Sequence, residues 1–163
     1  DLIAVEKGER VVNMDSQIPN KVVEEWIREG NLFPNATLVK PETTFGNSRF
    51  DLYIETAERK IFMEIKGVTL EDNGVVRFPD AQTERGVKHV EELMEAVKAG
   101  YEAYIFFVIQ MKDVRYLHPN DATDPAFGAA LREAAAAGVQ ILAMDCAITE
   151  NSMELRLPVL VKL

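Results

Sequence analysis

Two carboxylates and a lysine stand at the ends of two neighbouring segments that carry the alternating side-chain pattern of β-strands. Residues 49–55 and 60–66 are the two segments, and the four residues 56–59 between them suit a hairpin turn. Antiparallel pairing across that turn places Asp51 opposite Glu64. Because like charges directly opposite each other destabilise a strand pair, the pattern indicates that a cation lies between these two side chains.

The side chains of this predicted hairpin separate onto two faces, since successive strand residues point in opposite directions. The register pairs Leu52 with Met63 and Ile54 with Ile61. One face carries the apolar set Leu52, Ile54, Ile61, Met63 and Ile65, and the other carries Asp51, Tyr53, Phe62, Glu64 and Lys66. The charged groups therefore gather at one end of a single face.

The grouped side chains fit the chemistry of phosphodiester hydrolysis. Asp51, Glu64 and the backbone carbonyl of Ile65 form an oxygen-only ligand set suited to Mg²⁺ or Mn²⁺, with water and substrate phosphate in the remaining positions. Lys66 lies on the same face, where its ammonium could orient or help to deprotonate the attacking water. The alternative is an exposed ion-pair cluster at a strand end, and spacing alone favours it because Glu-x-Lys is common.

The elements around the hairpin predict an α/β fold with a mixed central sheet and helices on its faces. An amphipathic helix begins near Pro19 and ends at Gly30, and a second runs from a cap at Asp80 or Thr83 to Gly100. The remaining elements are a short strand over 36–40 ahead of Pro41, a turn-rich connection over 69–80, a strand buried on both faces over 103–109, a loop at 118–121, a helix over 126–137 closed by Gly138, and strands over 139–148 and 153–161.

Composition limits the class of protein. A chain of 163 residues with 47% hydrophobic content is long enough for one core and short for two domains. It shows neither an apolar run of membrane length nor a signal peptide at its start, so a cytoplasmic location without membrane contact is expected. Its formal net charge of −9 argues against a general nucleic-acid binder and requires a local basic face for any such partner. The single cysteine, Cys146, falls in an apolar run and is expected to be a buried thiol without a chemical role.

The order helix, strand, strand with Asp, strand with Glu-x-Lys, helix, strand resembles the core of the PD-(D/E)XK, restriction-endonuclease-like superfamily. Short words narrow the resemblance to the sugar fermentation stimulation protein A (SfsA) family. These words are DSQIPN at 15–20, GNSRFD at 46–51, FPDAQTERGVKH at 78–89, HPND at 118–121 and DPAF at 124–127. The twelve-residue word is the most specific, and together the words cover nearly the whole chain.

This resemblance implies a particular domain organisation and partner. SfsA proteins are known as non-specific DNA binders with a suggested regulatory role in sugar metabolism, especially of maltose, and usually begin with an OB-like barrel. The present chain resembles the nuclease-like domain alone, so residues 15–163 are predicted to form that domain and residues 1–14 to be a junction remnant or a short strand. Without the barrel, we expect weak, sequence-non-specific DNA binding.

The resemblance also implies site residues. It places the catalytic roles on Asp51, Glu64 and Lys66, and it brings the second helix beside them. Basic side chains at a helix N-terminus favour anions, so that helix supplies predicted nucleic-acid contacts, and the turn before Asp51 supplies two more. The predicted contacts are Gln82, Arg85, Lys88, His89, Asn47 and Arg49. A solvated helix face and a simple turn are the alternatives.

The role of Gly86 in the second helix is left open. Gly86 costs about 1 kcal/mol inside a helix relative to Ala, which indicates close approach of either a ligand or another part of the protein.

The activity of the chain is also left open. The chain is either a metal-dependent DNA endonuclease or exonuclease, or a catalytically inactive nuclease-fold module that serves regulation or protein interaction. The sequence does not specify its oligomeric state.

Overall fold

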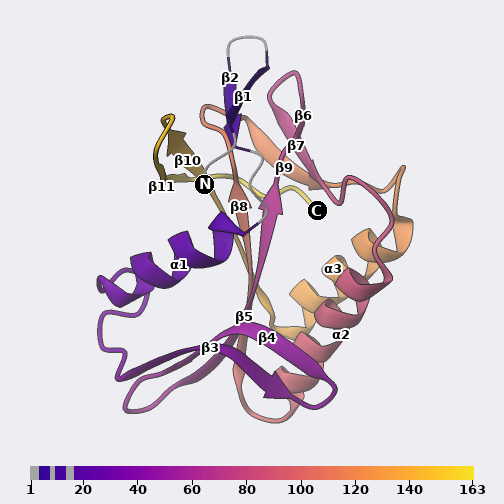
Figure 1. The fold of residues 1–163 in the computed structure, drawn as a ribbon. Helices are drawn as coiled ribbons and strands as arrows, with labels where there is room; N and C mark the ends of the chain where they lie inside the picture. Colours follow the sequence, from indigo (N-terminus) through magenta and orange to yellow (C-terminus); the bar gives the residue numbers. More distant parts are fainter. Residues whose placement is uncertain (1–3, 8–9, 14–16) are drawn as a thin grey trace.

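A six-stranded mixed sheet forms the centre of the computed structural model, which describes residues 4–7, 10–13 and 17–163, with side chains from Gln17 onward. The sheet order is β11-β10-β8-β5-β4-β3 (Figure 1). Strands β5, β8 and β10 are parallel, whereas β3, β4 and β11 are antiparallel to their neighbours. The bounds are β3 Leu38–Phe45, β4 Ser48–Glu55, β5 Lys60–Val68, β8 Glu102–Ile109, β10 Gln140–Ile148 and β11 Met153–Pro158. This arrangement confirms the predicted α/β class with a mixed sheet.

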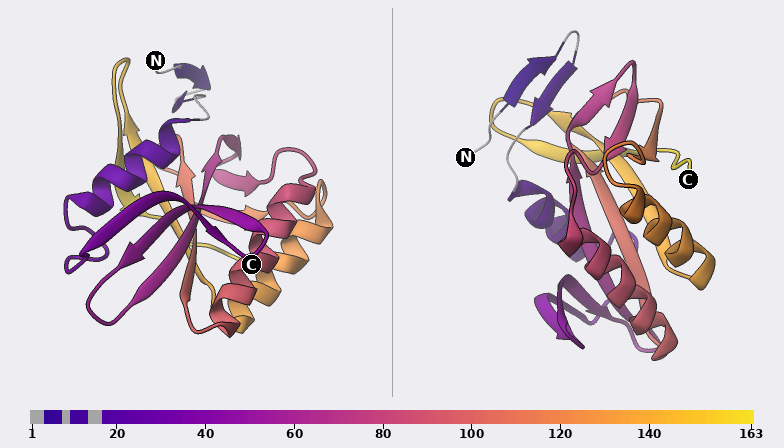
Figure 2. Two further views of the ribbon diagram at one scale, coloured as in Figure 1. Left: turned by 60° about the horizontal axis from the view of Figure 1, so that its bottom comes forward. Right: turned by 90° about the vertical axis from the view of Figure 1, so that its right-hand side faces the viewer.

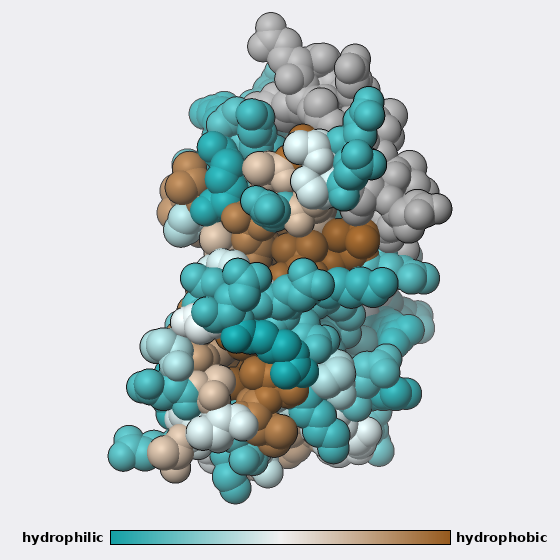
Figure 3. Space-filling model, turned by 60° about the vertical axis from the view of Figure 1, so that its left-hand side comes forward, coloured by the Kyte–Doolittle hydropathy of each residue, from teal (hydrophilic) through white to brown (hydrophobic). Residues whose placement is uncertain are grey.

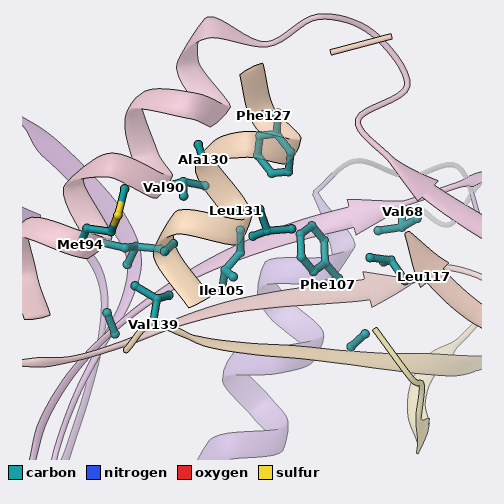
Figure 4. Packing of buried hydrophobic residues seen from close by; sticks show 14 of the residues in the cluster. Val68, Val90, Met94, Ile105, Phe107, Leu117, Phe127, Ala130, Leu131 and Val139 are labelled. Carbon is teal, nitrogen blue, oxygen red and sulfur yellow. The ribbon is translucent and has the colours of Figure 1, made fainter. Parts of the chain in front are cut away.

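Helices cover both faces of the sheet and divide the core into two clusters (Figures 1 and 2). Helix α1 (Ile18–Arg28) packs Val23 and Ile27 on one face, against the apolar hairpin face predicted from the sequence. Helices α2 (Glu84–Lys98) and α3 (Pro125–Ala137) cover the other face, where their apolar side chains meet Ile105 and Phe107 of β8 (Figure 4). Because β8 is sandwiched between the two clusters, it is apolar along nearly its whole length.

The ends of the helices follow local capping rules. Thr83 caps α2 by accepting a hydrogen bond from the Gly86 amide at 2.8 Å, so of the two predicted caps Thr83 is the one used. A Cβ on Gly86 would lie 2.7 Å from Thr83 Cγ2 and 3.4 Å from the Phe127 ring. The glycine is therefore explained by packing of the cap and of α3, which settles the question that the sequence left open. Helix α3 ends at Gly138, whose φ of 104° is left-handed, as predicted.

A second sheet of three strands lies where the sequence predicted only a connection and a loop. Strands β6 (Leu70–Asp72) and β7 (Val75–Phe78) form a hairpin around Asn73 and Gly74, both at positive φ, and β9 (Tyr116–Pro119) pairs in parallel with β7. The predicted turn at Asp72-Asn73-Gly74 is correct, but the flanking residues and the loop at 118 are strand. Strands of three or four residues are too short to show a period, and the pairing of β9 with β7 is non-local.

Strand β3 also extends beyond its predicted end at Lys40, through Pro41 to Phe45. It is an edge strand of the large sheet, where a proline without an N–H is tolerated. The β3–β4 ladder pairs Pro41 with Leu52 and Thr43 with Phe50, and it skips Glu42, which has a φ of 51°. The last strand is shorter than predicted and ends at Pro158.

At the start of the chain, β1 (Ala4–Lys7) and β2 (Arg10–Asn13) form an antiparallel pair. Residues 1–3, 8–9 and 14–16 lie outside the described residues, and with them Asp15 and Ser16 of the first family word and part of the predicted 1–14 segment.

No described helix is long and apolar enough to cross a membrane. Hydrophilic residues cover most of the face seen in Figure 3, with apolar residues showing between them.

Asp145 joins β10 and β11 at a bulge in their ladder, where the register shifts between Met144 and Cys146. Its carboxylate is only 2% exposed and accepts hydrogen bonds from Arg156 Nη2 at 2.5 Å and Nε at 3.2 Å. It also accepts one from the amide of Leu157 at 2.9 Å and one from the amide of Asp113 at 3.1 Å. Burial opposes ionisation, but the bonds from Arg156 and the backbone outweigh it and lower the pKa of Asp145.

We expect Asp145→Ala to lower the free energy of unfolding by about 3 kcal/mol at neutral pH, because it leaves the guanidinium and two amides without their acceptor. A carboxylate with a lowered pKa stabilises the fold above its unfolded pKa of about 3.9, and this contribution is lost as the pH falls through the lower folded value. Urea unfolding at pH 7 and pH 3 measures the effect, with the exposed Glu154→Ala on β11 as control. Equal stability of the Asp145 variant and this control at pH 7 would contradict the assignment.

Candidate functional site

Asp51 lies where β4 parts from β5. The observed ladder confirms the predicted pairs Leu52 with Met63 and Ile54 with Ile61. It ends at Leu52, so the predicted pairing of Asp51 with Glu64 is not part of it. Beyond it, Asp51 Oδ2 accepts a hydrogen bond from the Ile65 amide at 2.7 Å, so the side chain occupies the place that a backbone carbonyl would fill. Asp51 Oδ1 accepts a second bond, from Asn20 Nδ2 on α1, at 3.0 Å.

At Asp51, strand β4 changes which face of the sheet its apolar side chains bury. Phe50 packs in the cluster beneath α2 and α3, whereas Leu52 packs in the cluster beneath α1, although a regular strand would place both on one face. The change coincides with the pair that the β3–β4 ladder skips at Glu42. Asp51 therefore lies between the two clusters, where it can reach both α1 and the end of β5.

Glu64 of β5 is buried beside Asp51, with 2% of its surface exposed. Its Oε2 atom lies 2.5 Å from His89 Nδ1 of α2 and 3.1 Å from Lys66 Nζ. The other oxygen, Oε1, is buried and has no hydrogen-bond partner among the described residues. The described basic groups thus reach Oε2 only, and Glu64 also shares a hydrogen bond with the Asp51 carboxyl when that group is protonated. The sequence pattern offered either a metal or an ion-pair cluster as the partner of these charges.

The two carboxyl groups differ in their affinity for a proton. Burial and the neighbouring charge of Glu64 raise the pKa of Asp51 to about 7. Burial also acts to raise the pKa of Glu64, but the hydrogen bond from His89 and the charge of Lys66 lower it to about 2. Near neutral pH, Glu64 is ionised, while Asp51 retains an unusual affinity for a proton or for another cation.

The carboxylate oxygens of Asp51 and Glu64 suit a divalent cation as ligands. The described residues contain no group of three His, Cys, Asp or Glu side chains that could hold a metal ion, so a cage of side chains alone is ruled out for this part of the chain. Two carboxylates do converge, however, and Asp51 is hydrogen-bonded to the backbone of Ile65, whose carbonyl was the third predicted ligand. The buried, unpartnered Oε1 of Glu64 is the atom that a hard cation would satisfy.

The predicted nucleic-acid contacts fall into two groups. Gln82, Arg85 and Lys88 lie exposed on or just before the first turns of α2, and Lys88 Nζ donates to the Asn47 carbonyl at 3.1 Å, which joins α2 to the β3–β4 turn. His89 does not share this face, because it is buried against Glu64.

Arg49 is exposed and forms an ion pair with Glu42 at 3.2 Å. Its partner is also exposed, so the pair is worth little and a phosphate could replace the carboxylate. Arg49 therefore stays a predicted contact, on the same β3–β4 hairpin as Asn47.

Two residues near the site were not identified from the sequence. Asn20 holds Asp51, and its place in the word DSQIPN was the available signal. Gln110, which follows β8, is 2% exposed and lies so close to Gly67 that a Cβ there would be 2.4 Å from its Oε1. No local pattern connects Gln110 with Gly67, because the parallel pairing of β5 with β8 brings the two segments together.

Comparison with known proteins gives a consistent result. The family model described as the sugar fermentation stimulation protein RE domain matches residues 17–152. A sugar fermentation stimulation protein homolog of Clostridium beijerinckii is 57% identical over 155 residues, covering 95% of this chain and 69% of the relative. A homolog of Ruminiclostridium cellulolyticum is 56% identical over 163 residues, covering 100% of this chain and 72% of the relative.

A solved structure agrees in fold. The structure of Pyrococcus furiosus SfsA in complex with Ca²⁺ superposes with a TM-score of 0.90 at 27% sequence identity, over 98% of this chain and 71% of that one. The predicted restriction-endonuclease-like fold is thereby confirmed.

We expect Glu64→Gln to lower the pKa of Asp51 from about 7 toward its ordinary value of 3.8, because one of the two main causes of the rise is removed while burial remains. Carbon-13 NMR of the Asp51 carboxyl across a pH titration measures the change. Glu58→Gln, in the exposed hairpin turn, is the control and should leave the value unchanged. An Asp51 pKa that stays near 7 in Glu64→Gln would show that the two carboxyl groups do not interact.

Proposed function

The chain belongs to the sugar fermentation stimulation protein family, and on that basis we propose that it is a DNA-binding domain whose PD-(D/E)XK site takes Mg²⁺ or Mn²⁺ and hydrolyses phosphodiester bonds. The observation that carries the proposal is the buried, unpartnered Oε1 of Glu64 beside the Asp51 carboxyl. The Ca²⁺ complex of the Pyrococcus furiosus relative supports a divalent cation, since Ca²⁺ and Mg²⁺ both prefer oxygen ligands.

In this proposal Asp51, Glu64 and the Ile65 carbonyl hold the cation. When bound, the cation supplies charge stabilisation to a phosphate and lowers the pKa of an attacking water. Lys66 keeps 17% of its side chain exposed and places Nζ 3.1 Å from Glu64, so its ammonium stands at the edge of the ligand set. There it orients the water or contacts the scissile phosphate. Asn20 and the Ile65 amide each donate to one oxygen of Asp51 and so fix the orientation of its carboxyl group.

DNA reaches the site along α2 and the β3–β4 turn. Arg85 and Lys88 are exposed there, and neither forms an ion pair with a described residue, so their charges are available to phosphate groups. Gln82 and Asn47 add polar contacts at the same surface. With a net charge of −9 on the whole chain, this binding should be weak and strongly salt-dependent. A regulatory role in sugar metabolism, including that of maltose, belongs to the proposal through the family resemblance.

Metal binding is tested by thermal unfolding. Saturation to about 100 times Kd stabilises the native state by about 2.7 kcal/mol, which corresponds to a rise in Tm on the order of 5–10 °C for a chain of this size. We expect Mn²⁺ to raise the Tm of the wild type and of the control Glu58→Ala, and to leave Glu64→Ala unchanged. An equal rise in Glu64→Ala would place the cation elsewhere.

Catalysis is tested with labelled single-stranded and duplex DNA at low salt, with binding and cleavage measured together in Mg²⁺ or Mn²⁺. We expect cleavage by the wild type and a loss of at least about 100-fold in Lys66→Ala, the lower end of what positioned proton-transfer groups contribute. Lys60→Ala is the matched control, because Lys60 is exposed at the opposite end of the same strand. Binding without cleavage would instead identify a catalytically inactive module, and cleavage that survives in Lys66→Ala would refute the role of this lysine.

A further inference from the structure

We propose that His89 is a positioning residue for Glu64, which holds one carboxylate oxygen so that the other faces the cation. His89 was predicted to contact nucleic acid, but its imidazole is buried within the site. The inference rests on the proposed function, since it concerns how the metal ligand is oriented.

The contacts of Glu64 are strongly asymmetric. Oε2 receives both His89 Nδ1, at 2.5 Å, and Lys66 Nζ, at 3.1 Å, while Oε1 has no described partner although it is buried. A carboxylate held only by Lys66 could rotate and share both oxygens with the flexible ammonium. The imidazole is rigid and approaches from the opposite element, so it selects a single orientation of the carboxylate.

The short contact also determines where the ring proton lies. Next to an ionised carboxylate oxygen at 2.5 Å, Nδ1 is assigned the ring hydrogen. Lys66 Nζ forms an ion pair with the same oxygen at 3.1 Å and lies 3.4 Å from Nδ1, a contact whose donor and acceptor depend on the imidazole tautomer. His89 Nδ1 and Lys66 Nζ both lie against Oε2 of Glu64, so neither occupies the position beside Oε1 where a cation would bind.

His89 is itself held in place by the packing of α2. Its ring is 7% exposed and lies with its centroid 6.5 Å from that of Phe50, which is fully buried. The start of the helix is fixed by the Thr83 cap, and the Thr83 amide donates to Asp124 Oδ2 at 2.9 Å. Because the imidazole cannot move freely, it transmits the position of α2 to Glu64, as hydrogen-bonding partners of metal ligands do.

Three substitutions at this position separate orientation from packing. Asn places its amide nitrogen where Nδ1 lies, Gln places its amide nitrogen near Nε2, and Leu has no donor. In isothermal titration with Mn²⁺ we expect His89→Gln and His89→Leu to bind about 10–100-fold more weakly than the wild type and His89→Asn to remain within a few-fold of it. Glu91→Gln, exposed on the same helix, is the control.

The Tm of each metal-free variant is measured in parallel. Two outcomes would overturn the inference while the proposed function stands. In one, the Mn²⁺ affinity of the variants follows their loss of Tm and not the position of the substituted side chain's donor. In the other, all three variants bind Mn²⁺ like the wild type. A wild type that binds no Mn²⁺ would overturn both. Nitrogen-15 NMR of the metal-free wild type gives an independent readout: we expect a protonated Nδ1, and a ring protonated only at Nε2 would overturn the inference alone.

Discussion

Two carboxyl groups that would repel each other lie together at the end of the β4–β5 hairpin, and much of the surrounding structure is arranged to hold them there. Asp51 accepts bonds from the Ile65 amide and from Asn20, and Glu64 accepts them from His89 and Lys66. These donors come from α1, β5 and α2. The site therefore forms only when both helices are docked on the sheet, since each carboxylate depends on a different one.

The two-sided core explains how that docking is achieved. β8 and β5 lie side by side in the middle of the sheet, and each contributes apolar side chains to both clusters. Helix α1 is held by the cluster that contains Leu52 and Ile65, and α2 by the cluster that contains Phe50 and Phe62. Close packing allows little freedom in such an interior, so Asn20 and His89 reach the carboxylates in one geometry.

The electrostatics of the site contrast with those of the rest of the chain. Elsewhere, several arginines are bound to acids, as Arg59 is to Glu102 and Arg132 to Asp121. At the beginning of α2, Arg85 and Lys88 have no acidic partner among the described residues. The strongly acidic chain thus keeps these two basic side chains at the start of the helix that supplies His89 to Glu64, and this contrast underlies the proposed short-range attraction of a polyanion.

The sequence by itself determined the features that depend on local order. The register of Leu52 with Met63, the apolar face beneath α1 and the turn at Asn73-Gly74 follow from side-chain alternation, helix periodicity and turn chemistry. For the cap of α2 the sequence offered two candidates, Asp80 and Thr83, and the structure uses Thr83. The hairpin pattern together with the family resemblance predicted Asp51, Glu64 and Lys66 as site residues, and that assignment stays a prediction. Tertiary structure decided the rest: the pairing of β9 with β7, the course of β3 through Pro41, the bond from Asn20 and the burial of His89. The β9 pairing, the Asn20 bond and the His89 contact join segments far apart in the sequence, where the free energy comes from packing and pairing across the fold, so no local pattern encodes which partner is met. Strand β3 continues through Pro41 because it lies at the edge of the sheet, and its place there is also set by the tertiary structure.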